Sequence, residues 1–310
     1  MHNVRELQGQ SVARQLLLHY LENDPAHLLI FHGPPGTGKA AAAQAFIRQK
    51  LCAAGTGCGS CPSCLKMDRE HADFIRFPPI KVKIGDPEEP EEWTVRWLIR
   101  TRLIYAPFES KSRYVLFPDA RLILPEAETA LLKTLEEPPP ETFFIILTED
   151  LAFLRETIQS RGVLIPFHYL CREDLERISG IHNPDELDLL GGSLENRIWI
   201  RPDFYPALKE QIARSFEHPL ALLELEKYLN DYKIQFKFKD QEISREDLFD
   251  FAMHEMLQSS RTHEAARPIA DLLFQAKTDL RRNMPGLLPY IASRLFFALH
   301  RLLFSRRLDG

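Results

Sequence analysis

A glycine-rich loop at residues 33–39, Gly-Pro-Pro-Gly-Thr-Gly-Lys, has the residue types and spacing that could hold a phosphate chain. Its glycines let backbone N–H groups turn inward around the anion, and the lysine adds a positive charge. An apolar segment leads into the loop and an alanine-rich helical segment leads out, which is the setting of a nucleotide site. A glycine-rich turn without a ligand is the alternative. The candidate phosphate-binding residues are Gly33, Gly36, Thr37, Gly38 and Lys39.

Ala40 departs from the pattern, because a serine or threonine normally follows the lysine and holds magnesium. Without that hydroxyl, a magnesium ion loses one of its two protein contacts. The other contact is expected at the end of a second apolar strand, near residues 113–121. Asp119 is one possible magnesium ligand there, yet Ala40 and Arg121 leave even that site incomplete. The loop is therefore expected to bind ATP or ADP weakly or not at all, without the magnesium chemistry of hydrolysis.

Four of the five cysteines lie close together in the sequence. Cysteines separated by two residues can turn both sulfurs toward one point, and four thiolates satisfy tetrahedral zinc at about 2.3 Å. Because sulfur fills all four positions, no site is left for water, so the expected zinc is structural and not catalytic. Four buried or free thiols are the alternative, and Cys171 stands alone. The candidate zinc ligands are Cys52, Cys58, Cys61 and Cys64.

The composition suits an ordinary globular protein, with 45% hydrophobic residues in 310. The net charge of −5 lacks the basic surplus expected of a protein that grips nucleic acid alone. No stretch reaches the roughly 18 apolar residues of a membrane span, and the first residues have no signal-peptide core. The expected location is the cytoplasm.

Short apolar runs alternate with helical patterns in the first half of the chain, which predicts an α/β domain with a parallel sheet. A helix is expected around Ala127–Leu135, ending before Pro138, and residues 78–93 are expected to form a surface loop. The strand candidates are residues 27–33, 73–79, 113–118, 143–148 and 163–167.

Strand signals fade after Tyr169, where short helical patterns are broken at Gly180 and Gly191. Beyond residue 205 the pattern is almost wholly helical. The expected division is an α/β domain at 1–167 with the cysteine module at 52–64, a small helical lid at 168–205 and an all-α domain at 206–310. The last helix carries an apolar stripe made of Ile291, Leu295, Leu299, Leu302 and Leu303, which indicates core packing.

Arg161 follows a short helix after the fourth strand candidate, where a guanidinium fork could reach phosphates bound by a neighbouring subunit. A surface arginine in a local ion pair is the usual alternative.

Several segments together resemble the clamp-loader subunits of bacterial DNA polymerase III, which are AAA+ proteins. The resemblance covers roughly the first 170 residues. The stretch Leu-Leu-Lys-Thr-Leu-Glu-Glu-Pro-Pro at 131–139 is highly specific to this group. It is part of a longer similar segment, residues 130–148. The other similar segments are residues 9–17, the loop at 33–39, the four cysteines with residues 71–74, and residues 159–167.

The family contains ATP-hydrolysing gamma/tau subunits and a delta prime branch that typically lacks catalysis yet supplies an arginine finger. In the family register, Pro118 replaces the metal-binding aspartate, Asp119 replaces the catalytic glutamate and Ala40 replaces the loop hydroxyl. These departures favour the delta prime branch. Arg161 falls on the arginine of the Ser-Arg-Cys motif, although Gly162 replaces its cysteine.

The resemblance also implies sensor positions and partners. Thr148 falls on the first sensor, and Glu195 stands where hydrolysing members carry a sensor arginine, with Arg197 two residues later. The implied partners are the gamma/tau and delta subunits, the sliding clamp, and primer-template DNA through the complex. The resemblance also implies that the all-α domain at 206–310 is a collar that holds a ring of five subunits together. Two other functions remain open: a gamma-like ATPase that uses Asp119, and a scaffold outside replication that borrows the fold.

Overall fold

The computed structural model describes residues 3–23, 26–67, 70–200, 205–231, 237–238, 241–242, 245–281 and 288–304. The chain forms two compact units, Met1–Arg197 and Ile198–Gly310. Among the described helices, none is long and apolar enough to cross a membrane.

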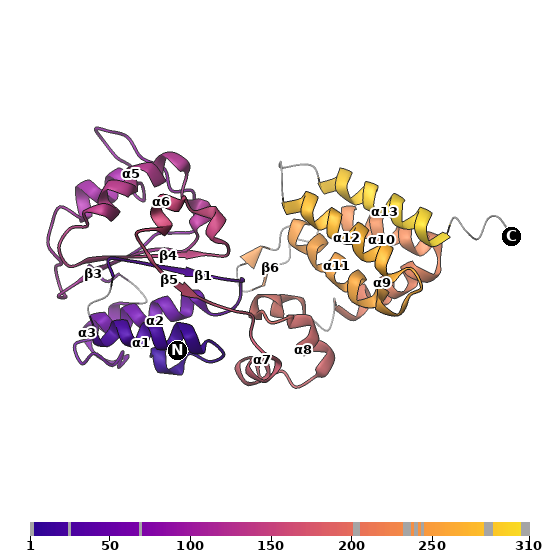
Figure 1. Ribbon diagram of the computed structural model, residues 1–310, viewed down its shortest axis with the longest axis horizontal. Helices are drawn as coiled ribbons and strands as arrows, with labels where there is room; N and C mark the ends of the chain where they lie inside the picture. Colours follow the sequence, from indigo (N-terminus) through magenta and orange to yellow (C-terminus); the bar gives the residue numbers. More distant parts are fainter. Residues whose placement is uncertain are drawn as a thin grey trace. The chain divides into compact units, whose positions relative to one another are not determined.

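The first unit is built on a sheet of five parallel strands in the order β2-β3-β4-β1-β5 (Figure 1). Each strand overlaps one of the five apolar segments named above, which confirms the predicted α/β fold. The strands are β1 (Leu28–His32), β2 (Phe74–Arg76), β3 (Arg113–Phe117), β4 (Thr142–Thr148) and β5 (Val163–Pro166).

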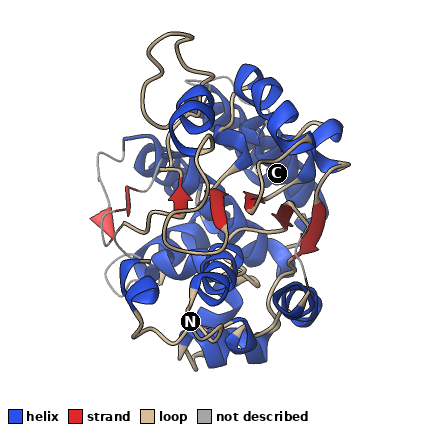
Figure 2. Cartoon of the chain, turned by 90° about the vertical axis from the view of Figure 1, so that its left-hand side faces the viewer, coloured by secondary structure: helices blue, strands red, loops and turns tan. Residues whose placement is uncertain are grey.

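Both faces of this sheet are buried, which explains why its strands are continuous apolar runs. In β1, Leu28 and Ile30 belong to one hydrophobic core, whereas Leu29 and Phe31 belong to the core on the opposite face. Figures 1 and 2 show helices on the two sides of the strands. One face carries α1 (Ser11–Glu22), α2 (Lys39–Leu51) and α3 (Pro62–Lys66), and the other carries α5 (Pro125–Glu136) and α6 (Glu156–Gln159).

The predicted helix at 127–135 is α5, whose first turn has a proline at the start and two glutamates that suit the helix dipole. Several short helices link the remaining parts of the unit. They are η1 (Val4–Glu6), α4 (Val95–Trp97), η2 (Leu98–Arg102), η3 (Ala120–Leu122) and η4 (Leu151–Phe153). The predicted loop at 78–93 contains no helix or strand and is tied down by a bridge between Val82 and Ile123.

After the sheet, the chain forms α7 (Arg172–Ser179), α8 (Pro184–Leu190) and η5 (Leu194–Trp199). The helix breaks fall where the glycines predicted them, and Gly180 ends α7 in the left-handed conformation. Residues 168–197, which lie in the first unit, are called the lid below.

The described part of the second unit consists mainly of helices (Figure 1), with two short antiparallel strands that the sequence did not predict. Of the predicted stripe on the last helix, Ile291, Leu295 and Leu299 are buried, and Leu302 and Leu303 are half-buried. The elements are α9 (Tyr205–Glu217), α10 (Pro219–Asp231), β6 (Lys237–Phe238), β7 (Gln241–Glu242), α11 (Arg245–Ser259), η6 (Ser260–Thr262), α12 (Ala266–Arg281) and α13 (Leu288–Phe304).

Candidate functional site

The glycine-rich loop starts at the carboxyl end of β1, between the ends of two neighbouring strands. His32 pairs with Thr148 of β4 on one side and with Pro166 of β5 on the other. The N–H of Gly33 donates to the Thr148 carbonyl at 3.2 Å. Gly33 has φ of +137°, and a Cβ there would lie 2.0 Å from the Phe167 carbonyl oxygen, so only glycine fits this turn.

Every carbonyl of the loop from residue 33 to residue 37 accepts a hydrogen bond. The Lys39 ammonium donates to the Gly33 and Pro34 carbonyls at 2.5 and 2.6 Å. By contrast, no hydrogen bond among the described residues uses the N–H groups of Gly36, Thr37 and Gly38. The loop therefore turns its carbonyls toward protein and leaves its donors available, which is the arrangement of an anion site.

Gln10, whose role the sequence did not reveal, fixes the loop from behind. Its amide donates to the Thr37 carbonyl at 3.3 Å and to the His168 carbonyl at 2.6 Å, and its oxygen accepts the His168 N–H at 3.0 Å. The side chain is 3% exposed. This buried amide joins elements that are far apart in the sequence, because it bonds three backbone groups. The only signal for it in the sequence was that Gln10 lies in segment 9–17, which resembles the family.

Charged side chains from three other elements surround Lys39. Burial lowers the pKa of the Lys39 ammonium, and the nearby carboxylates of Glu149, Glu195 and Asp119 act in the opposite direction. Arg121 is close enough to lower the same pKa by repulsion. The loop lysine thus lies among three carboxylates and a second cation before any ligand arrives.

Asp119, the possible magnesium ligand, is paired with Arg121. Both of its carboxylate oxygens accept bonds from the Arg121 guanidinium, at 2.8–3.1 Å, and one also accepts the Arg121 N–H at 2.9 Å. Arg121 extends to Glu149 at 2.9 Å. With Ala40 in the loop and Pro118 at the strand end, these residues do not fit a magnesium-bound nucleotide.

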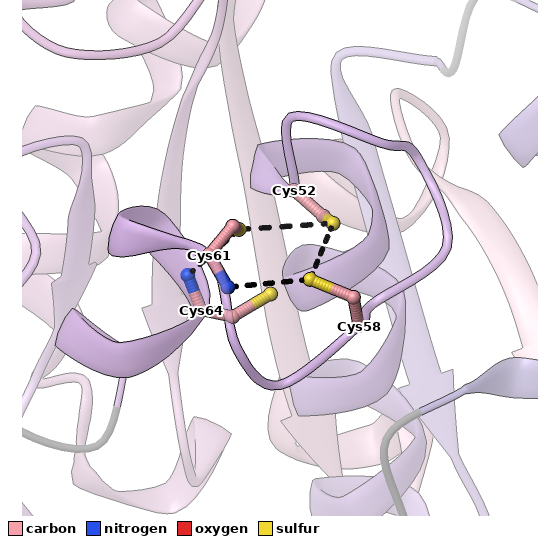
Figure 3. Close-up of side chains that lie close together, drawn as sticks. All are labelled: Cys52, Cys58, Cys61 and Cys64. Atoms are coloured by element: carbon pink, nitrogen blue, oxygen red, sulfur yellow. Dashed lines mark hydrogen bonds between the residues drawn. The ribbon is translucent and has the colours of Figure 1, made fainter.

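The predicted cysteines converge on one point (Figure 3). The four sulfurs lie within 4.8 Å of one another. Cys52 directly follows α2, and α3 carries Cys64, so two helices and the loop between them bring the ligands together. Four thiolates around a common point are the donor set of a structural zinc site.

The thiols differ in their readiness to lose a proton. Burial opposes ionisation of Cys52, but backbone N–H donors from Cys58, Ala54 and Thr56 outweigh it and lower the pKa of this thiol to about 5. Burial raises the pKa of the Cys64 thiol to about 12. A cation would favour the thiolate form at such a position.

A second loop beside the cysteines is organised by Asp73, which the sequence did not single out. This carboxylate is fully buried and accepts the N–H groups of Phe108, Glu109 and Ser110 at 2.6–2.7 Å. Arg113, 4.0 Å away and also buried, donates to three carbonyls of the same loop. The loop is therefore held by a buried charged pair.

Arg161 lies at the surface, with its side chain 33% exposed. Its guanidinium donates to the Glu136 carboxylate and to the Thr157 carbonyl. Glu136 belongs to the segment 131–139 that carries the family resemblance. Among the described residues, Arg161 thus forms a local ion pair.

The family model that matches this chain describes a DNA polymerase III subunit, and so do the names of three of its relatives. A family model described as DNA polymerase III, delta subunit, matches residues 9–170. The delta prime subunits of Yersinia pestis and Escherichia coli are each 34% identical, over 152 and 162 residues, covering 48% and 50% of this chain and 43% and 46% of theirs. The Mycobacterium tuberculosis gamma/tau subunit is 31% identical over 148 residues, covering 46% of this chain and 25% of its own.

This chain therefore covers less than half the length of each of these relatives. A solved structure of a gamma subunit-related protein of DNA polymerase III from Thermotoga maritima has a TM-score of 0.50 at 15% identity, over 94% of this chain and 99% of the other. That likeness concerns the fold. Because the family model spans more than half of the 310 residues, the chain belongs to the DNA polymerase III delta subunit family, as a clamp-loader-family protein of delta prime type.

Proposed function

We propose that this chain is the delta prime, or stator, subunit of a clamp loader that places a sliding clamp on primed DNA. The observation that carries the proposal is the pairing of Asp119 with Arg121. A carboxylate whose two oxygens both bind a guanidinium is poorly placed to hold magnesium or to orient water. With Ala40 and Pro118 as neighbours in the site, hydrolysis belongs to other subunits.

Arg161 is the residue proposed to act on a neighbour. Its planar guanidinium could leave Glu136 and bind the γ-phosphate held by an adjacent ATPase subunit, where it would stabilise developing charge. The proposed partners are the gamma/tau and delta subunits, the sliding clamp, and primer-template DNA through the complex.

The four cysteines are proposed to bind one structural zinc ion. The convergence of their sulfurs supports this assignment, and the metal would cross-link the end of α2 to α3. Thiolate ligands persist in a reducing compartment, so the cytoplasm is the proposed location. The proposed domains are an AAA+ domain at 1–167, a helical lid domain at 168–205, of which the lid residues 168–197 lie in the first unit, and a collar at 206–310.

An ATP-hydrolysing gamma/tau-type subunit is the second candidate function. The 31% identity to the gamma/tau subunit of Mycobacterium tuberculosis and the unbroken loop through Lys39 favour it. In that case Asp119 would have to release Arg121 before it could act as a base.

The test is DNA-stimulated ATP hydrolysis by a complex reconstituted from this chain and the gamma and delta subunits of the same genome. We expect no turnover by the isolated chain and at least a hundredfold loss of rate in the complex with Arg161→Ala. Arg155→Ala is a matched control, because Arg155 is a surface arginine of the same segment that pairs with Glu128 at 3.2 Å. Turnover by the isolated chain that depends on Lys39 would identify a gamma-type subunit instead.

A further inference from the structure

The two middle cysteines of the module are oriented by the module's own backbone and side chains (Figure 3). The Cys58 sulfur accepts the Cys61 N–H at 3.3 Å, and the Cys61 sulfur accepts the Cys64 N–H at 3.5 Å. The Ser60 hydroxyl donates to the Cys58 sulfur at 3.5 Å. These bonds direct the sulfurs of Cys58 and Cys61 by contacts within residues 58–64.

The two outer cysteines are joined by one residue outside the module, Arg48. The Cys52 N–H donates to the Arg48 carbonyl at 2.9 Å, at the end of α2. The Arg48 guanidinium donates through Nη1 to the Cys64 carbonyl at 3.1 Å. Cys64 lies on α3, which contacts α2. Arg48 thus connects the first and the last of the four cysteines, and it does so from a helix that lies before the module in the sequence.

The guanidinium that makes this connection is buried. Arg48 is 7% exposed, and Cys52 and Cys64 are buried beside it. Arginine is rarely buried unless its donors are bonded, because a charged group loses its hydration there. Lys66 is two residues from Cys64, yet its side chain is 47% exposed and pairs with Glu109 at 2.8 Å. The contact of Arg48 with the backbone of Cys64 is therefore a built feature of the fold, whereas Lys66 is an ordinary surface cation.

We propose that Arg48 is a positioning residue of the zinc site, which fixes Cys52 and Cys64 relative to each other and keeps a cation beside the ligands. The inference rests on the proposed binding of zinc by the four cysteines. Four thiolates give a zinc centre a net negative charge, which a buried guanidinium opposes. Holding the outer ligands in place lowers the cost of ordering the chain when the metal binds. Arg48 would then act on the metal through the residues that bind it.

The test is the zinc affinity of the full chain, measured by competition with a chromophoric chelator. We expect Arg48→Met to weaken zinc binding by about tenfold or more, because partners of metal ligands contribute roughly 10–100-fold to metal affinity. Cobalt(II) serves as a spectroscopic probe of the same site. At saturation Arg48→Met should show the thiolate-to-cobalt charge-transfer band of the wild type at unchanged intensity, since all four ligands remain.

A second measurement separates positioning of the ligands from a general effect on the fold. Thermal unfolding of the wild type and of Arg48→Met is compared with zinc and with excess chelator. We expect the melting temperatures to differ more with zinc, because only the zinc-bound state includes the lost affinity. An equal difference under both conditions would mean that Arg48 supports the fold alone, and would overturn the proposal.

Lys66→Met is the matched control, because it removes a cation close to Cys64 in the sequence without touching the Cys64 backbone. It should bind zinc as the wild type does. If Arg48→Met does not fold, Arg48→Lys decides, since it keeps the charge but loses the guanidinium fork, and about threefold weaker binding or more is expected.

Two results would overturn the inference in different ways. A wild-type chain that binds one zinc ion, with equal affinity in the Arg48 and Lys66 variants, would remove the role of Arg48 and leave the zinc assignment intact. A wild-type chain that binds neither zinc nor cobalt would remove the zinc assignment and the positioning role together.

Discussion

The cysteine module and the glycine-rich loop carry equally clear sequence motifs, yet their surroundings differ. In the module the four sulfurs lie within 4.8 Å of one another, and the ligand set is complete within 13 consecutive residues, 52–64. In the loop, Glu149 and Glu195 from distant segments place negative charge near Lys39, and Arg121 adds a second cation. A motif thus specifies which residues can bind a ligand, whereas the residues that the fold places around the motif determine whether the ligand binds.

The largest expected effect is on the cysteine side of this comparison. Cys58→Ser should reduce bound zinc from one ion per chain by at least tenfold and lower the melting temperature, because structural zinc contributes to folding. The measurement is metal content by mass spectrometry together with thermal unfolding. Cys171→Ser is the control, since Cys171 lies outside the cluster. Equal zinc content in the two variants would contradict the assignment of the four cysteines as zinc ligands.

The loop that contains Phe108–Ser110, beside the cysteine module, is held by a buried charged pair and not by a metal. Asp73→Ala removes the carboxylate that accepts three backbone N–H groups and leaves the Arg113 guanidinium buried without its anionic partner, which should cost about 3–5 kcal/mol of unfolding free energy. Urea unfolding measures this loss. The loss of unfolding free energy should be the same with and without a chelator. A loss below about 1 kcal/mol would mean that the buried pair does not organise this loop.

The third prediction concerns Lys39 as a structural group. Lys39→Met removes a charged donor from the Gly33 and Pro34 carbonyls and should destabilise the chain by about 1–2 kcal/mol without any nucleotide present. Thermal unfolding of the isolated chain checks this. An unchanged unfolding free energy would mean that the Lys39 ammonium does not stabilise the loop.

The smallest effect is expected in the second unit, at a buried carboxylate. Burial raises the pKa of Glu255, which is 5% exposed and accepts a hydrogen bond from the Tyr205 hydroxyl at 3.3 Å. The fold therefore favours the protonated acid, and its stabilising contribution is lost as the pH rises through the folded-state pKa.

Glu255→Gln should accordingly stabilise the protein by about 1 kcal/mol at pH 7 and have no effect near pH 4, where the acid is already neutral. Urea unfolding at the two pH values measures the difference. Stabilisation that is equal at both would show that charge is not the cause.

Much of the fold could be predicted because it follows from local spacing. Apolar runs of strand length gave the five strands, and Gly180 marked the end of α7. The paired strands β6 and β7 were missed because each is two residues long, which is too short to show a repeating pattern of apolar residues.

The candidate sites divide in the same way. The spacing of the cysteines and of the loop glycines is a property of short segments, so the sequence by itself determined which donors could converge. The ion pair between Arg121 and Glu149, and the hydrogen bond from the Ser193 hydroxyl to the Pro35 carbonyl, join segments that lie far apart in the sequence. Only the tertiary structure decided these contacts, because charge and close packing act between residues that a linear pattern never places side by side.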